Sequence, residues 1–169
     1  YMSAETQSDG LDAALRRRRL MPLVPYDGET LTLKGGASLT FLGPAEDIPA
    51  DRVNDRSLIT LFQTGSASVL LMGDAEEPAE QSLLRHHPGL RCDILKVGHH
   101  GSDTSSSPAF LSALGAQTAI ISCGTDNDYG HPAEQTLTNL TLAGVRDIRM
   151  TAESGTVALP LIAYKENAV

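Results

Sequence analysis

In the stretch LKVGHHGS, residues 95–102, an apolar strand pattern runs directly into a glycine-flanked pair of histidines. Two neighbouring apolar runs also lead into ligand-type residues. Residues 67–72 are followed by Gly73-Asp74-Ala75-Glu76, and residues 117–122 are followed by a loop that contains His131. Sites in open α/β sheets form at the carboxyl ends of the strands. We therefore predict a functional site where these three strands end.

The rest of the chain supplies the other elements of such a sheet. Alternating apolar residues predict two β-hairpins, with strands over 31–33 and 38–42 and then over 57–62 and 67–72. Helices predicted over 76–86, 108–115 and 132–143 then alternate with strands over 93–97, 117–122, 146–150 and 155–159. A further helix is predicted over 9–20. Hairpins followed by strand–helix alternation predict one α/β domain over residues 1–169, with helices covering one face of the sheet.

Composition excludes several classes of protein. The 169 residues contain 13 Lys and Arg against 21 Asp and Glu, so the net charge of −8 argues against a general polyanion binder. No apolar run approaches the roughly 20 residues that span a bilayer, and no signal-peptide pattern is present. Two cysteines, Cys92 and Cys123, are too few for a disulfide framework and are expected to be buried strand residues.

Aspartate and histidine together are suitable ligands for zinc, manganese or iron. Each candidate also has an alternative role. Asp74 could cap the following helix, with Glu77 completing a capping box. His131 could mark the start of a helix at Pro132. Adjacent side chains of an extended segment point to opposite sides, so one of His99 and His100 could be a ligand and the other an acid–base group.

These residues occur in an order that resembles a known family. The matching segments are NDRSL at 54–58, LMGDAE at 71–76, LKVGHHGS at 95–102, SSS at 105–107 and YGHP at 129–132. Together they resemble the metallo-β-lactamase-fold domain of the ComEC-type DNA-uptake channel proteins, from about residue 31 to about residue 157. The resemblance implies a metallo-β-lactamase-like αββα sandwich. It also implies that the present chain is the C-terminal portion of that fold, incomplete at its N-terminus.

The resemblance implies two divalent metal ions, zinc or manganese, in the complete domain. Asp74 matches the bridging ligand, and His99, His100 and His131 match the downstream ligand positions. The His-x-His-x-Asp-His motif of the family has no counterpart, because the first histidine of the chain is His86. We therefore expect this chain alone to bind no metal or one metal weakly, and the missing N-terminal half of the fold to be its partner.

The implied function is metal-dependent hydrolysis of a phosphodiester, most directly DNA in a competence context. A metal pair would lower the pKa of a bridging water, and His99 or His100 would be a ligand or protonate the leaving oxygen. Ser102, Ser105 and Asn127 are candidates to orient the phosphate, with capping and turn formation as their alternative. A small phosphoester substrate and a non-catalytic remnant are the alternative functions. The expected location is bacterial, either tethered to the membrane by a transmembrane channel domain or cytoplasmic; the oligomeric state is left open.

Overall fold

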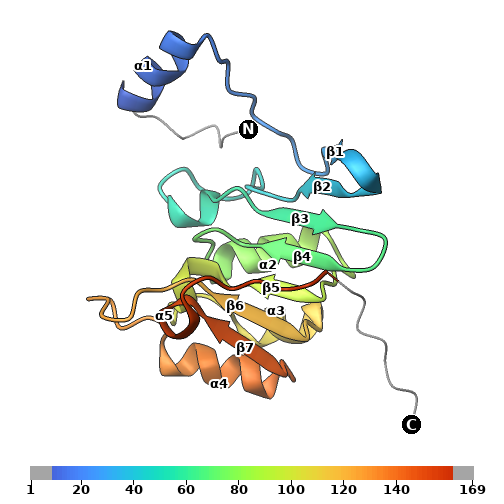
Figure 1. Cartoon of the computed structure of the whole chain (residues 1–169), viewed down its shortest axis with the longest axis vertical. Helices are drawn as coiled ribbons and strands as arrows, with labels where there is room; N and C mark the ends of the chain where they lie inside the picture. The colour runs from blue at the N-terminus through green and yellow to red at the C-terminus, as the bar shows by residue number, and fades with distance from the viewer. Residues whose placement is uncertain (1–8, 162–169) are drawn as a thin grey trace.

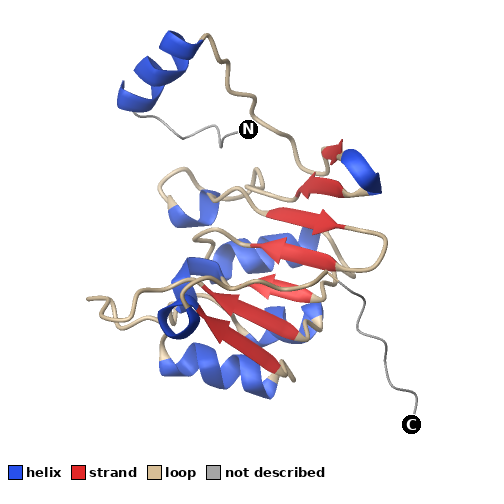
Figure 2. Ribbon diagram, in the orientation of Figure 1, coloured by secondary structure: helices blue, strands red, loops and turns tan. Residues whose placement is uncertain are grey.

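The computed structural model describes residues 9–161, and these form one seven-stranded sheet (Figures 1 and 2). The strands are β1 (Thr30–Thr32), β2 (Ser38–Phe41), β3 (Thr60–Gln63), β4 (Ser68–Leu71), β5 (Ile94–Lys96), β6 (Thr118–Ile121) and β7 (Asp147–Met150). They lie side by side in the order in which they occur in the chain. Pairing is antiparallel from β1 to β4 and parallel from β4 to β7. The prediction of hairpins followed by strand–helix alternation is confirmed.

Three helices cover one face of the sheet (Figure 2). The helices and 3₁₀ turns are α1 (Asp9–Arg18), η1 (Lys34–Gly36), η2 (Asn54–Arg56), α2 (Glu77–His86), η3 (Gly98–Gly101), α3 (Pro108–Leu114), α4 (Glu134–Leu142) and α5 (Thr151–Ser154). The covering layer consists of α2, α3 and α4, and each of them lies between two strands of the chain. The described residues therefore make one sheet and one helical layer, which are two of the four layers of an αββα sandwich.

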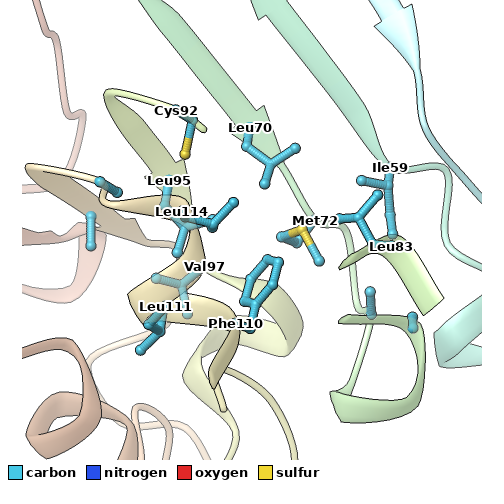
Figure 3. Close-up of a cluster of buried hydrophobic side chains, with 14 of the residues drawn as sticks. Ile59, Leu70, Met72, Leu83, Cys92, Leu95, Val97, Phe110, Leu111 and Leu114 are labelled. Atoms are coloured by element: carbon cyan, nitrogen blue, oxygen red, sulfur yellow. The ribbon is translucent and has the colours of Figure 1, made fainter. Parts of the chain in front are cut away.

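The core lies between the sheet and this helical layer (Figure 3). Leu70 of β4 and Leu95 of β5 face each other across the parallel ladder, and both are completely buried. Phe110 and Leu114 of α3 belong to the same cluster. Burial of each such side chain stabilises the fold by roughly 1.5–3 kcal/mol. The carboxyl ends of β4 and β5 are therefore held on a rigid base.

The opposite face of the sheet is less covered. Alternation along the strands turns Leu71 of β4 and Lys96 of β5 toward this face, and they are paired in register. Leu71 is 38% exposed. Residues 155–161 run across this face in Figure 1, and the Ser66 hydroxyl donates a hydrogen bond to the Leu161 carbonyl oxygen (3.1 Å). The predicted strand over 155–159 is wrong, because this segment pairs with no strand of the described sheet.

Two further expectations concern cysteines and membrane spans. Cys92 is buried beside β5, and burial raises the pKa of its thiol to about 12; Cys123, just beyond β6, is partly exposed. Both thiols are free. Within residues 9–161, none of the helices combines the length and the apolar character needed to cross a membrane.

Candidate functional site at the carboxyl edge of the sheet

The loops that follow β4 and β5 are in close contact at the carboxyl edge of the sheet. A Cβ atom at Gly98 would lie 2.5 Å from the carbonyl oxygen of Ala75, so only glycine fits there. The next two residues, His99 and His100, have φ angles of 44° and 56°, in the left-handed region that side chains rarely adopt. Such strain is typical of functional sites. This backbone presents both imidazoles at the edge where Asp74 emerges from β4.

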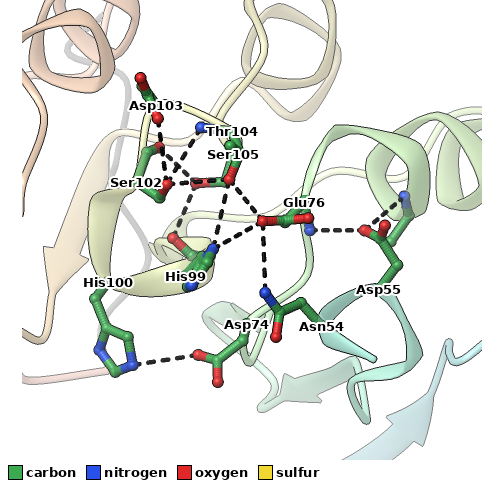
Figure 4. A network of polar contacts seen from close by, with 12 residues as sticks. Asn54, Asp55, Asp74, Glu76, His99, His100, Ser102, Asp103, Thr104 and Ser105 are labelled. Carbon is green, nitrogen blue, oxygen red and sulfur yellow. Dashed lines mark hydrogen bonds and ion pairs between the residues drawn. The ribbon is translucent and has the colours of Figure 1, made fainter. Parts of the chain in front are cut away.

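Asp74 and His100 are the first pair of this site (Figure 4). The Asp74 Oδ1 and His100 Nε2 atoms are 3.2 Å apart, and both side chains are about half exposed. The other ring nitrogen, Nδ1, lies 2.7 Å from the Ser122 carbonyl oxygen. Because a carbonyl only accepts, Nδ1 donates to Ser122, and Nε2 is the nitrogen that faces the Asp74 carboxylate. A carboxylate oxygen and an imidazole nitrogen at this separation can share a proton or a cation between them.

The helix-capping alternative for Asp74 is wrong. Its side chain contacts His100, and the first turn of α2 is capped from elsewhere in the chain. The buried Asp55 carboxylate accepts hydrogen bonds through Oδ1 from the backbone amides of Glu76 (2.9 Å) and Ala79 (3.3 Å). A carboxylate in this position is favoured by the helix dipole. The Asp74 carboxylate is therefore left available for the site.

Glu76 and His99 are the second pair. The Glu76 Oε1 atom lies 3.1 Å from His99 Nδ1 and also accepts hydrogen bonds from the Thr104 hydroxyl (2.8 Å) and the Asn54 amide (3.5 Å). Figure 4 shows Glu76 between these groups. Since an ionised carboxylate only accepts, His99 donates through Nδ1, and its other ring nitrogen, Nε2, is directed away from this contact. Glu76 was not among the predicted site residues, although it stands only two residues after Asp74.

His131 completes the imidazole cluster from the loop after β6. Its ring centroid lies 5.8 Å from that of His99, and Tyr129 stacks on it at 5.8 Å with an interplanar angle of 19°. Burial lowers the pKa of His131, and repulsion from His99 and His100 lowers it further. Its buried Nδ1 atom has no hydrogen-bond partner among the described residues. A neutral imidazole with an unsatisfied buried nitrogen has the protonation state that a metal ligand requires.

The three predicted phosphate-orienting residues are engaged in local structure. Ser102 and Ser105 are buried, and the Ser105 hydroxyl donates to the carbonyl oxygens of Gly98 (3.0 Å) and Ser102 (3.1 Å). The Asn127 side chain accepts from the His131 amide (2.8 Å) and donates to the His131 carbonyl oxygen (2.6 Å). These contacts match the turn-forming alternative, and they show that Asn127 fixes the backbone position of His131.

Lys96 is the cation closest in sequence to the histidine pair, and it projects from the sheet face opposite the helices. Its ammonium group donates to the Val97 carbonyl oxygen (2.7 Å) and forms no ion pair within the described part of the chain. Burial lowers its pKa, while the charge of Asp74 acts in the opposite direction. In the sequence, this position is marked by a single lysine at the end of an otherwise apolar strand.

Beside His131 there is a cavity of about 210 Å³ with a mostly apolar wall. It is lined by His100, Cys123, Gly124, Asn127, Tyr129 and His131. Tyr129 belongs to the YGHP motif, from which no role for its side chain was predicted. The cavity could not be predicted, because residues from two separate loops, after β5 and after β6, form its wall.

The metal ions that the fold implies require a set of nitrogen and oxygen donor atoms, and the residues of the site can be compared with that requirement. The 3.2 Å separation of Asp74 Oδ1 and His100 Nε2 suits two ligands of one ion, given metal–ligand bonds of about 2.0–2.2 Å. Within residues 9–161, however, no group of three or more His, Cys, Asp or Glu side chains converges on one point. The donor chemistry therefore fits, but the ligand number does not make a complete centre.

No family model matches the chain. Curated proteins are similar to it in sequence. ComE operon protein 3 of Bacillus subtilis is 38% identical over 130 residues, which are 77% of this chain and 16% of the relative. Competence protein ComA of Neisseria gonorrhoeae is 36% identical over 115 residues, 68% of this chain and 16% of the relative. The chain is homologous to the ComEC-type competence proteins. It spans about one sixth of the length of these two competence proteins.

Solved structures confirm the fold class. A protein from Parabacteroides distasonis described as a metal-dependent hydrolase matches with a TM-score of 0.52 at 15% identity, over 83% of this chain and 62% of that one. The E377D mutant of CmlA β-hydroxylase matches with a TM-score of 0.53 at 18% identity, over 83% and 34%. The competence-protein homologue described here therefore has the metallo-β-lactamase-like α/β fold that the sequence motifs predicted.

Proposed function

We propose that this domain supplies one side of the catalytic centre of a metal-dependent hydrolase that cleaves phosphodiesters in DNA. The observation that carries the proposal is the meeting of Asp74, His99, His100 and His131 at the carboxyl edge of the sheet, in a homologue of competence proteins. Carboxylate and imidazole are the ligand types that zinc and manganese use in hydrolases.

The side chains of the chain itself have distinct roles in this proposal. Asp74 and His100 are the pair that attracts a cation, since a carboxylate oxygen and an imidazole nitrogen lie 3.2 Å apart. His99 presents its Nε2 atom, which is suited to coordinate a cation or to take up a proton. Lys96 offers a positive charge that attracts the substrate phosphate, because its ammonium group forms no ion pair in the described region.

We propose that the remaining metal ligands come from protein outside this sequence. The family motif His-x-His-x-Asp-His is absent from the 169 residues, and the donor groups described above are too few for two ions. The relatives are about six times longer than the matched segment, which supports action within a larger bacterial protein. In this proposal the domain is tethered to a membrane channel, and a cytoplasmic location is the alternative.

The net charge of −8 supports one competing proposal, hydrolysis of a small phosphoester. Proteins that bind nucleic acid usually present a basic surface. The incomplete ligand set supports another, a domain that binds without catalysis.

The test is manganese-dependent cleavage of a 5′-labelled single-stranded oligonucleotide, with bis(p-nitrophenyl) phosphate assayed in parallel. If the coding region upstream of Tyr1 contains a His-x-His-x-Asp-His motif, the longer protein is assayed, and otherwise this chain is. Cleavage of the oligonucleotide that falls by roughly a hundredfold or more in D74N supports the proposal. Turnover of the small phosphodiester alone favours the small-substrate alternative, and loss of neither activity in D74N contradicts the assigned site.

A further inference from the structure

We propose that the cavity beside His131 is a subsite for an unpaired nucleobase, which stacks on the ring of Tyr129. This inference rests on the proposed function and specifies its substrate as single-stranded nucleic acid. The base in question belongs to the nucleotide whose phosphate lies at the Asp74–His100 edge.

The cavity has the size and lining that a heterocycle requires. Its volume is about 210 Å³, and a dry apolar cavity of about 150 Å³ is already able to hold benzene. The wall is mostly apolar, and the imidazole of His100 is a polar group that could contact the edge of a base. A pyrimidine or purine ring therefore matches this space better than a phosphate or a carboxylate does.

Tyr129 is presented as a stacking surface. Its side chain is 82% exposed, although one face of the ring lies on His131 at 5.8 Å and 19°. The loop that carries it is fixed, because the Asn127 amide is hydrogen-bonded to both the amide and the carbonyl of His131. A ring that is held in place on one face and open on the other loses little freedom when a base stacks on it.

The rings form a path from the phosphate position to the cavity. The centroid of His131 lies 5.8 Å from that of His99 and 5.8 Å from that of Tyr129. A phosphate at the edge marked by His99 therefore has its own nucleotide base within reach of Tyr129. Only an unstacked, unpaired base can reach the ring, which specifies a single strand.

The charge of the chain makes such a contact necessary. With a net charge of −8, the domain cannot rely on the many phosphate contacts that give most nucleic-acid binders their affinity. Stacking on an aromatic ring is insensitive to this charge and tolerates every base. We infer that binding of a short single strand to this domain depends on Tyr129 and only weakly on salt.

The test measures the affinity of the chain for a 5′-fluorescein-labelled thymidine hexanucleotide by fluorescence anisotropy, in EDTA so that no cleavage occurs. Y129A is expected to weaken binding roughly tenfold, while Y129F stays within about twofold of the wild type. Tyr26 supplies the matched control, because it is 72% exposed and precedes β1 at the opposite edge of the sheet; Y26A should bind normally.

An oligonucleotide with an abasic site at each position in turn gives the second arm. One abasic position should weaken wild-type binding as much as Y129A does, and should have no further effect in Y129A. Normal binding by Y129A, additive effects of the two changes, or no detectable binding by the wild type at millimolar concentration would overturn the subsite. Because the binding assay requires no hydrolysis, base-dependent binding by this chain combined with no cleavage by the longer protein that carries the remaining metal ligands would reject the proposed function and leave the subsite intact. Cleavage with an unchanged KM in Y129A would reject the subsite and leave the proposed function intact.

Discussion

The Glu76 carboxylate holds His99 in one orientation, with Oε1 3.1 Å from Nδ1. The two residues belong to the loops after neighbouring strands, and the Thr104 hydroxyl donates to the same oxygen. This contact decides which nitrogen of His99 carries a proton and which is free. Residues that orient a ligand imidazole in this way commonly affect metal affinity or activity by 10- to 100-fold.

The first prediction concerns the tautomer of His99. In the wild type at neutral pH, a long-range ¹H–¹⁵N spectrum should show His99 protonated at Nδ1, because Glu76 accepts there. E76A should give a mixture of tautomers, whereas E76Q should keep the wild-type tautomer, since its amide oxygen still accepts. A His99 spectrum that is unchanged in E76A would show that Glu76 does not position the ring.

The second prediction concerns the contact between the loops after β4 and β5. G98A should lower the free energy of unfolding by about 2–3 kcal/mol, because the new methyl group would meet the Ala75 carbonyl oxygen at 2.5 Å. Urea denaturation measures this change. Gly65 is the matched control, since a Cβ there meets nothing within 4 Å, and G65A should change the free energy of unfolding by less than about 1 kcal/mol. Equal effects of the two substitutions would contradict the close contact.

The third prediction concerns Glu80, which is buried in α2 and accepts hydrogen bonds from the backbone amides of Ser106 and Ser107. Burial raises its pKa above the ordinary 4.5, against the opposing effect of these amides. A raised pKa in the folded state means that the folded protein binds the proton more tightly. The stabilisation linked to this proton is complete below pH 4.5 and is lost as the pH rises through the raised pKa.

The corresponding measurement is the free energy of unfolding of wild type and E80Q between pH 4 and pH 8. The free energy of unfolding of the wild type minus that of E80Q should decrease as the pH rises, by about 1.4 kcal/mol for each tenfold change in the proton affinity of Glu80. E80A should be destabilised at every pH by about 2–3 kcal/mol, because two buried amides lose their acceptor. A difference that is constant with pH would show that the pKa of Glu80 is not raised.

The fourth prediction concerns Lys96 and follows from the proposed function. K96A should raise the KM for the phosphodiester by roughly tenfold or more, because a charge-assisted hydrogen bond to the phosphate is lost. K96R should retain part of the binding. Arg149 is the control, since it lies two strands away on the same sheet face, in register with Ile120, and R149A should leave KM unchanged. Equal effects of K96A and R149A would indicate general electrostatic attraction only.

Much of this fold could be predicted from the pattern of apolar residues within individual β-strands. The apolar runs that became β4, β5 and β6 predicted the carboxyl edge, and Asp74 and the histidine pair lie there. The segment 155–159 had the same alternation but forms no ladder in the described sheet, because periodicity does not reveal whether a neighbouring strand is available.

The finer features of the site depend on contacts between distant segments. Asp55 caps α2 from a loop more than twenty residues earlier in the chain, so a local capping box at Asp74 was a reasonable but wrong alternative. Ser105 and Asn127 differ from Asp74 in this respect, because their side chains bind the backbone of their own loops, as their turn-forming alternative predicted. Residue type indicated polar chemistry at these positions, but one sequence cannot show which atoms already satisfy it.

The order of the strands has a consequence for how the chain is made. Each strand from β2 to β7 pairs with the strand that precedes it in the chain. During synthesis, the pairing partner of every new strand has therefore already left the ribosome. Growth by such short steps avoids long searches for distant partners. His131 follows β6 and precedes β7, so the imidazole cluster forms only after six of the seven strands have been made. A nascent chain would hold most of the sheet before the third side of the site is in place.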